Sequence, residues 1–178
     1  METKRASERI ETPRLILRKS RMEDWRDLYE NIWRSAEAAR YMFWSPTTDE
    51  ESARARMERT LAWEKTHPFK YVVEEKEGGR VIGWAGVEEL DEKTWGETGV
   101  ALGPAFQRRG YGREILDALC ELCRAQGAEC FVAAAREGNL ASNALIRERG
   151  FVFDRSEARV DERNGESFLM NWYHRDLT

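Results

Sequence analysis

The stretch Gln107-Arg108-Arg109-Gly110-Tyr111-Gly112 decides how this sequence is interpreted. It follows an apolar segment that ends at Leu102 and leads into the most regular helical pattern of the chain, residues 110–126. Glycines at a helix start let a ligand approach the backbone closely, and the first N–H groups of a helix have no partners within it. The helix dipole favours negative charge at this end, and Arg113 follows directly. The stretch therefore predicts a phosphate or pyrophosphate site, although a plain strand-to-helix turn would also explain its glycines.

Two other nucleotide-binding motifs do not fit this stretch. It lacks the third glycine of the dinucleotide fingerprint, and it lacks the Gly-Lys-Ser/Thr ending of a P-loop.

The hydrophobic pattern on either side alternates between strand and helix periods. We expect strands at residues 14–18, 69–75, 80–90, 95–102, 129–135, 151–158 and 167–174, and helices at residues 22–33, 50–65, 110–126 and 139–149. Residues 129–135 are apolar, as expected of a central strand covered on both faces. This order predicts an α/β fold of three layers, with a mixed sheet whose first part is antiparallel. The length of 178 residues fits a single domain, 1–178, with residues 1–10 as a loose extension.

Composition narrows the class of protein. The 29 Lys and Arg against 33 Asp and Glu argue against a general nucleic-acid binder. No apolar run approaches the roughly 18 residues of a membrane span, so we expect no membrane partner. Three clustered cysteines favour a reducing, cytoplasmic setting. Cys120 and Cys123 lie in mid-helix without matching ligands, so neither a redox site nor a metal site is expected.

The pattern Gln107-x-x-Gly110-x-Gly112 resembles the pyrophosphate motif of the GNAT N-acetyltransferase superfamily. Five further segments, in the right order, resemble its RimJ/RimL-like branch: ETPRLILR at 11–18, VIGWAG at 81–86, GETG at 96–99, NLASN at 139–143 and ERGF at 148–151. The resemblance implies a three-layer α/β/α fold with a mostly antiparallel sheet. It also implies that two central parallel strands, residues 95–102 and 129–135, splay apart around the cofactor.

The cofactor implied by this resemblance is acetyl-CoA. Its pantetheine arm would pair with the backbone of Val100, Ala101 and Leu102. Its pyrophosphate would lie on the amides of Gln107, Arg108, Arg109, Gly110, Tyr111 and Gly112, with Arg113 nearby. Asn139 and Ser142 would contact the pantetheine or its thiol end, although Asn139 fits a helix N-cap equally well and Ser142 a first-turn serine that bonds to the cap.

The reaction implied is direct attack of a neutral primary amine on the thioester carbonyl. A base must take the ammonium proton, and Glu97 is our candidate, with Glu88 and Glu89 as rivals; a solvated or ion-paired Glu97 is the alternative. Many members carry a tyrosine as general acid where this chain has Ile146. The acid is therefore left open between Ser142, a water molecule and no dedicated group.

The acceptor side is less defined. Tyr41, Phe43 and Trp44 precede a loop and are candidates for the acceptor pocket, although aromatic core packing also explains them. The charged run 49–59 reads as a solvated helix face. The acceptor could be a protein N-terminal α-amine or a small-molecule amine, and the family suggests a homodimer. The alternatives are a non-catalytic acyl-CoA-binding regulatory domain and an RNA- or ribosome-associated protein.

Overall fold

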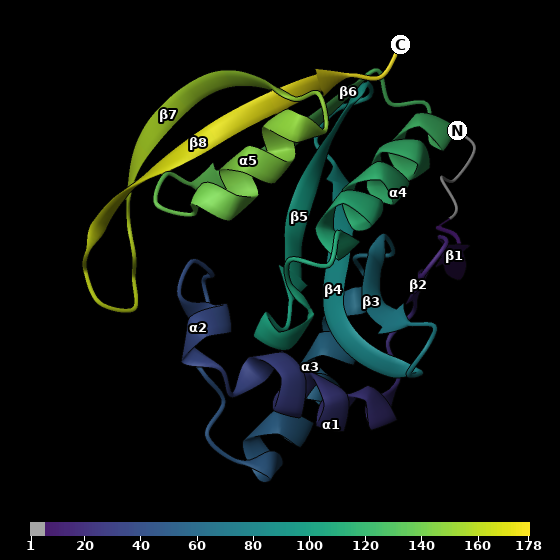
Figure 1. The fold of residues 1–178 in the computed structure, drawn as a ribbon, viewed down its shortest axis with the longest axis vertical. Helices are drawn as coiled ribbons and strands as arrows, with labels where there is room; N and C mark the ends of the chain where they lie inside the picture. Colours follow the sequence, from purple (N-terminus) through teal and green to yellow (C-terminus); the bar gives the residue numbers. More distant parts are fainter. Residues whose placement is uncertain (1–5) are drawn as a thin grey trace. The chain divides into compact units, whose positions relative to one another are not determined.

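The computed structural model describes residues 6–178, which contain an eight-stranded sheet in the order β1-β2-β3-β4-β5-β6-β8-β7 (Figure 1). Its strands are β1 (Arg9–Glu11), β2 (Leu15–Arg18), β3 (Lys70–Glu75), β4 (Arg80–Glu89), β5 (Thr94–Leu102), β6 (Cys130–Arg136), β7 (Val152–Val160) and β8 (Ser167–Asp176). Strand β6 pairs with β5 in parallel and with β8 antiparallel. The sheet is therefore mixed, and the antiparallel pairing of β1 through β4 confirms the predicted character of its first part.

The helices are α1 (Trp25–Leu28), α2 (Ala36–Ala39), α3 (Glu50–Glu64), α4 (Tyr111–Ala125) and α5 (Leu140–Glu148). The helix expected at 22–33 is segmented into a 3-10 turn, α1 and a π-helical turn, Tyr29–Trp33. Three short elements were not predicted: β1, α2 and the 3-10 turn Pro104–Phe106. Strand β1 corrects the expectation of a loose extension at 1–10, because Arg9 and Ile10 pair with Arg18 and Leu17 of β2; residues 1–5 of that extension lie outside the described residues.

The chain forms two compact units. The first unit contains the residues up to Gly86 together with Thr98–Ile115, and the second unit contains Val87–Glu97 together with Leu116–Thr178. Strands β4 and β5 and helix α4 contribute residues to both units.

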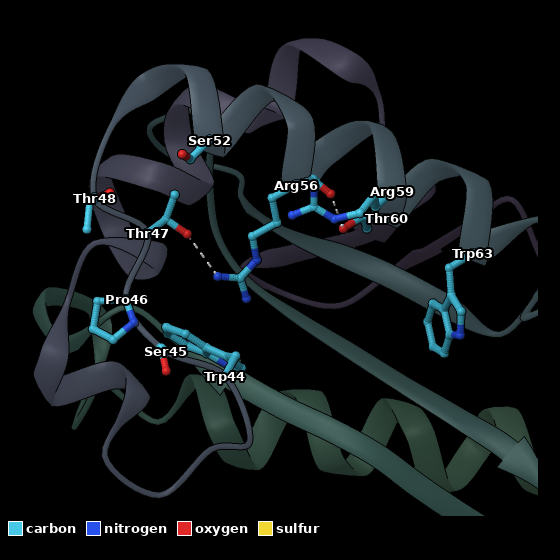
Figure 2. Close-up of a pocket in the computed structure, with 10 residues that line it drawn as sticks. All are labelled: Trp44, Ser45, Pro46, Thr47, Thr48, Ser52, Arg56, Arg59, Thr60 and Trp63. Carbon is cyan, nitrogen blue, oxygen red and sulfur yellow. Dashed lines mark hydrogen bonds between the residues drawn. The ribbon is translucent and has the colours of Figure 1, made fainter. Parts of the chain in front are cut away.

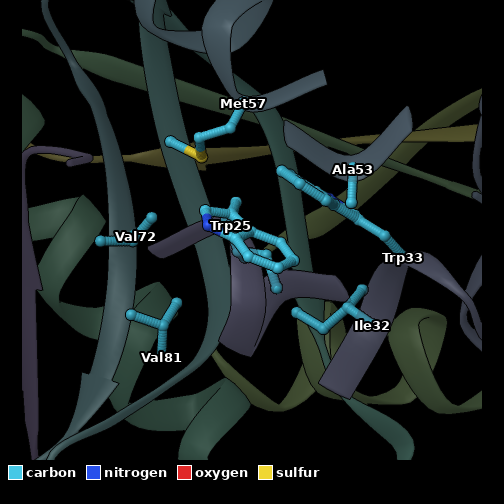
Figure 3. Close-up of a cluster of buried hydrophobic side chains, with 8 residues drawn as sticks. Trp25, Ile32, Trp33, Ala53, Met57, Val72 and Val81 are labelled. Atoms are coloured by element: carbon cyan, nitrogen blue, oxygen red, sulfur yellow. The ribbon is translucent and has the colours of Figure 1, made fainter. Parts of the chain in front are cut away.

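The core of the first unit lies between a pair of helical segments and two strands (Figure 3). Trp25, Leu28 and Ile32 recur at helical spacing and are buried against residues of α3, β3 and β4. The α3 side of this cluster contributes Ala53 and Met57. Helix α3 begins at a clear N-cap, because Asp49 accepts a hydrogen bond from the Ser52 N–H at 2.7 Å. This capped, packed helix positions the side chains of the cavity described below.

In the second unit, α5 is fastened to β8 by one buried amide. The Asn143 Oδ1 accepts from the Tyr173 hydroxyl at 2.6 Å and from the Asn171 side chain at 3.0 Å. The Asn143 Nδ2 donates to the Arg136 and Asn139 carbonyls at 2.8 and 2.7 Å. The Asn143 Oδ1 thus has two donors and its Nδ2 has two acceptors, all within the protein, as a buried polar side chain requires.

The expectation that both faces of residues 129–135 are covered is wrong in part. Phe131, Ala133 and Ala135 are buried, but the residues between them are only half-buried, as in a strand with one covered face. Among residues 6–178, no helix combines the length and apolar character that a membrane crossing needs.

Candidate active site

The segment between β5 and α4 forms a tight backbone turn in the first unit. Arg108 and Gly110 both have left-handed backbones, with φ of 60° and 81°. Helix α4 begins at Tyr111, so Gly110 lies just before the helix and Gly112 lies in its first turn. Alternating left- and right-handed residues turn successive N–H groups to one side and make a concavity that suits an anion. The two left-handed residues suit such a concavity, and the pyrophosphate site at this turn stays a prediction.

A brace from the N-terminal segment holds this turn. The Arg14 backbone N–H and its Nε donate to the Glu114 carboxylate at 2.7 and 2.9 Å, and Arg14 Nη1 donates to the Arg109 carbonyl at 2.8 Å. The Arg14 guanidinium also lies 4.6 Å from the centre of the Tyr111 ring. Burial disfavours the charge of Glu114, but hydrogen bonds from Thr12 and Arg14 outweigh it and keep its pKa below the ordinary value. The charged Glu114 carboxylate is thus paired with Arg14, a contact that was not predicted from the sequence.

Strand β5 is irregular where it leads toward the turn. Gly99 has φ of 124°, a conformation that other residues rarely adopt, within the continuous strand Thr94–Leu102. At Ala101 the neighbouring strand comes very close, because a Cβ on Gly83 would lie 2.2 Å from the Ala101 carbonyl oxygen. The Gln107 side chain donates to the Leu102 carbonyl at 3.1 Å and so ties the turn to the end of β5.

The other residues predicted for the chemistry belong to the second unit. Asn139 is the N-cap of α5, with its Oδ1 accepting from the Ser142 N–H at 3.2 Å. Glu97 is half-buried in β5, and Glu88 and Glu89 are exposed. Ile146 is buried at 5% exposure. This position therefore serves the core of the second unit.

Two cavities in the first unit lie beside α3. The outer cavity has a volume of about 530 Å³ (Figure 2) and is lined by Trp44, Ser45, Pro46, Thr47, Thr48, Ser52, Arg56, Arg59, Thr60 and Trp63. The inner cavity has a volume of about 210 Å³ and is lined by Ser20, Leu28, Trp33, Trp44, Arg56, Thr60, Glu64, Lys70, Tyr71, Val72, Trp84 and Ala85. Trp44, Arg56 and Thr60 line both.

Of the three aromatic residues predicted for the acceptor pocket, Trp44 lines both cavities and stacks at a tilt on Trp84, with ring centres 5.8 Å apart. Tyr41 and Phe43 do not line either cavity, and Phe43 is 64% exposed. Arg56 also lines both cavities, although its charged run predicts a solvated helix face.

The inner cavity contains a carboxyl group with an altered pKa. Burial raises the pKa of Glu64, although its carboxylate accepts a hydrogen bond from Ser20 Oγ at 2.6 Å. On the same wall, Lys70 Nζ donates to the Thr98 carbonyl at 3.1 Å. Trp84 reaches the same part of β5, with its Nε1 3.8 Å from where a Cβ on Gly99 would lie. Trp84, one of the residues that line the inner cavity, thus lies near β5 at its irregular residue.

Comparison with known proteins decides the family. The family model described as an acetyltransferase (GNAT) domain matches residues 14–152. The chain belongs to the GNAT acetyltransferase family. Membership confirms the predicted family, fold and enzyme class.

Solved structures of GNAT proteins share the fold. A GCN5-related N-acetyltransferase from Brucella melitensis has a TM-score of 0.85 at 14% identity, covering 98% of this chain and 80% of the other. The microcin C7 self-immunity acetyltransferase MccE, in complex with acetyl-CoA and AMP, has a TM-score of 0.79 at 19% identity, covering 93% of both chains. An acetyltransferase from Salmonella typhimurium that modifies the N-terminal serine of ribosomal protein L7/L12 has a TM-score of 0.74 at 20% identity, covering 93% and 96%. No curated protein sequence matches this GNAT chain.

Proposed function

We propose that this GNAT protein transfers an acetyl group from acetyl-CoA to a primary amine, which attacks the thioester carbonyl directly. The observation that carries the proposal is the turn at Arg108 and Gly110, at the start of α4, in a chain that matches the acetyltransferase model over residues 14–152. The complex of MccE with acetyl-CoA, a protein of the same fold, supports the choice of donor.

In this proposal the backbone N–H groups of Gln107 through Gly112 hold the pyrophosphate, and Arg113 adds positive charge. The pantetheine pairs with the backbone of β5 at Val100 and Ala101, and less with Leu102, whose carbonyl already accepts from Gln107. Asn139 uses its Oδ1 for the α5 cap, so its side-chain N–H groups are those that would donate to the pantetheine, with Ser142 beside it. The bound cofactor supplies the acetyl thioester.

The base that removes the ammonium proton is proposed to be a carboxylate. Glu97 is the choice carried from the sequence. Glu64 is a second candidate, because burial raises its pKa toward that of an amine and it lines the inner cavity. The pH profiles of Glu97→Gln and Glu64→Gln separate the two candidates. The variant that lacks the true base loses the rise in kcat/KM that deprotonation of this carboxyl group causes, and the other variant keeps that rise.

The acceptor is proposed to be a protein N-terminal α-amine or a small-molecule amine that contacts Trp44, the predicted aromatic residue that lines both cavities. The Salmonella typhimurium relative modifies an N-terminal serine, which supports testing peptides first. We further propose a RimJ/RimL-like, cytoplasmic enzyme, organised as one domain over residues 1–178 and assembled as a homodimer.

The test is release of free thiol from acetyl-CoA in the presence of amines of both classes. We expect turnover with at least one class, and binding of CoA that weakens when the turn at Gly110 is altered. Tight CoA binding without turnover on any amine, unchanged by Glu97→Gln and Glu64→Gln, would instead establish a non-catalytic acyl-CoA-binding domain.

A further inference from the structure

The outer cavity beside α3 has a one-sided charge. Of the residues that line it, the charged ones are Arg56 and Arg59, and no carboxylate is among them. Arg59 is exposed at the rim, and Arg56 is half-buried and reaches into both cavities. The lining itself is therefore cationic, and the Asp49 carboxylate behind it accepts hydrogen bonds from two lining residues, Thr48 and Ser52.

Arg56 is held in place by aromatic rings and not by an acid. Its guanidinium carbon lies 4.6 Å from the centre of the Trp33 ring and 4.7 Å from the centre of the Trp44 ring. Its Nη1 donates to Thr47 Oγ1 at 3.1 Å, as Figure 2 shows. Within residues 6–178 it makes no ion pair. Ring contacts fix the orientation of a guanidinium, but they offset only part of the cost of burying its charge.

The electrostatic surroundings of Arg56 point the same way. Burial and the nearby positive charge of Arg59 lower the pKa of Arg56 to about 10. Both influences disfavour the charged guanidinium, and the attraction of a bound anion would offset them. A planar guanidinium with one nitrogen committed to Thr47 still offers further N–H donors, which suit the paired oxygens of a carboxylate or phosphate.

The inner cavity supplies the other half of a binding site. It shares Arg56 with the outer cavity and continues to Glu64, Lys70 and Trp84, the last of which lies against β5 at Gly99. A molecule whose anion is bound at Arg56 and whose other end enters the inner cavity would meet the Glu64 carboxylate, which attracts an amine, and the Lys70 ammonium, which repels its charged form. The outer volume of about 530 Å³ is the size of a small-molecule site.

We propose that the acceptor is a small amine carrying an oxyanion, either a carboxylate or a phosphate, and that Arg56 binds this oxyanion in the outer cavity. This inference rests on the proposed function, because it names the acceptor class of the same enzyme.

The catalytic test compares amines with and without the anion, and kcat/KM is expressed per neutral amine because a nearby anion also raises the pKa of the amine. Glycine is compared with glycinamide, and O-phosphoethanolamine with ethanolamine, by thiol release at saturating acetyl-CoA. We expect kcat/KM for an anionic member to exceed that of its neutral partner by about ten- to a hundred-fold, the effect of one or two hydrogen bonds to a charged group. The two pairs separate carboxylate from phosphate as the preferred anion.

Substitutions in helix α3 then test whether the preference for an anionic amine depends on Arg56. Arg56→Gln should bring the ratio of each pair close to one, and Arg56→Lys, which keeps the charge and most of the packing, should lower it without changing CoA affinity. Arg54→Gln is the matched control: Arg54 lies on α3, is exposed, pairs with Glu50 at 3.8 Å and lines neither cavity. A preference that survives both Arg56 variants, or no preference in the wild type, overturns the proposal.

A binding readout keeps this inference separate from the catalytic proposal. Inorganic phosphate is titrated into the CoA-bound protein and followed by the fluorescence of its tryptophans, two of which flank Arg56. We expect a saturable change in the wild type and in Arg54→Gln that is lost in Arg56→Gln and weakened in Arg56→Lys. If no amine is acetylated, the proposed function fails, and the titration still decides the site. An identical phosphate response in the wild type and Arg56→Gln overturns it.

Discussion

Replacement of Gly110 by alanine tests whether the turn before α4 is an anion site. Gly110 has φ of 81°, and an alanine in that conformation costs about 1–2 kcal/mol. The new Cβ would also lie 3.2 Å from Arg14 Nη2, in the brace that holds the turn. Both effects favour a rearranged turn, in which one or more N–H groups no longer face the pyrophosphate.

The expected loss follows from those N–H groups. A hydrogen bond to a charged group contributes about 1.5–3 kcal/mol, so the loss of one raises the Kd for CoA by about 10- to 150-fold. Isothermal titration calorimetry with CoA measures this change, and thermal unfolding should show a Tm lower by about 2–8 °C.

Gly127→Ala is the matched control for this experiment. Gly127 has φ of 84° just after α4, and no atom lies within 4 Å of its added Cβ. It should lower the Tm to a similar extent and leave CoA affinity unchanged. If Gly110→Ala loses stability like the control and still binds CoA as tightly as the wild type, the turn is not the pyrophosphate site.

Three further outcomes are expected. Asn143→Ala should lower the free energy of unfolding by about 3 kcal/mol, because it leaves the buried Tyr173 hydroxyl without its acceptor; urea denaturation measures this, and a loss below about 1 kcal/mol contradicts it. Burial raises the pKa of Cys120 to about 11 and of Cys123 to about 12, so a thiol reagent at pH 8 should label neither in the native protein and both in denaturant, and rapid native labelling of either would refute their burial. Burial raises the pKa of Glu64 in the folded state, so the native protein binds a proton at this carboxyl group more tightly than the unfolded chain does. The protonated Glu64 therefore contributes stability in acid, and this contribution should fall as the pH rises through the raised pKa. A series of Tm values should show this decline in the wild type and a smaller one in Glu64→Gln, and equal slopes would disprove it.

Long regular elements were predictable from the sequence, because their signals are local. The 15-residue helix α4 repeats apolar residues over four turns, and the expected range 110–126 matches Tyr111–Ala125 closely. Strand β1 has three residues and helix α2 has four, too few to show a hydrophobic period. The interruption at Tyr29–Trp33 also leaves the helical apolar spacing intact, so the sequence did not indicate the π-helical turn.

The site was only partly predictable, for a different reason. The glycines of the turn indicate an unusual backbone conformation by themselves, and Asn139 indicates a helix N-cap. Arg56 lies in a charged run and shows no local sign of burial, because the rings that enclose it, Trp33 and Trp44, come from other segments. The partnership of Arg14 with Glu114 likewise joins residues 100 positions apart. Contacts of this kind exist only once the chain has folded.

The Arg14–Glu114 brace has a consequence for the order of folding. The contact joins residues 100 positions apart, so it closes one of the longest loops of the first unit, and long loops are costly to close early. The anion-binding turn should therefore mature late, after α4 and the hairpins have formed locally. In a refolding experiment, the ability to bind CoA should return more slowly than helical circular dichroism. On a ribosome, a nascent chain would complete this anion-binding turn only after residue 114 had left the exit tunnel.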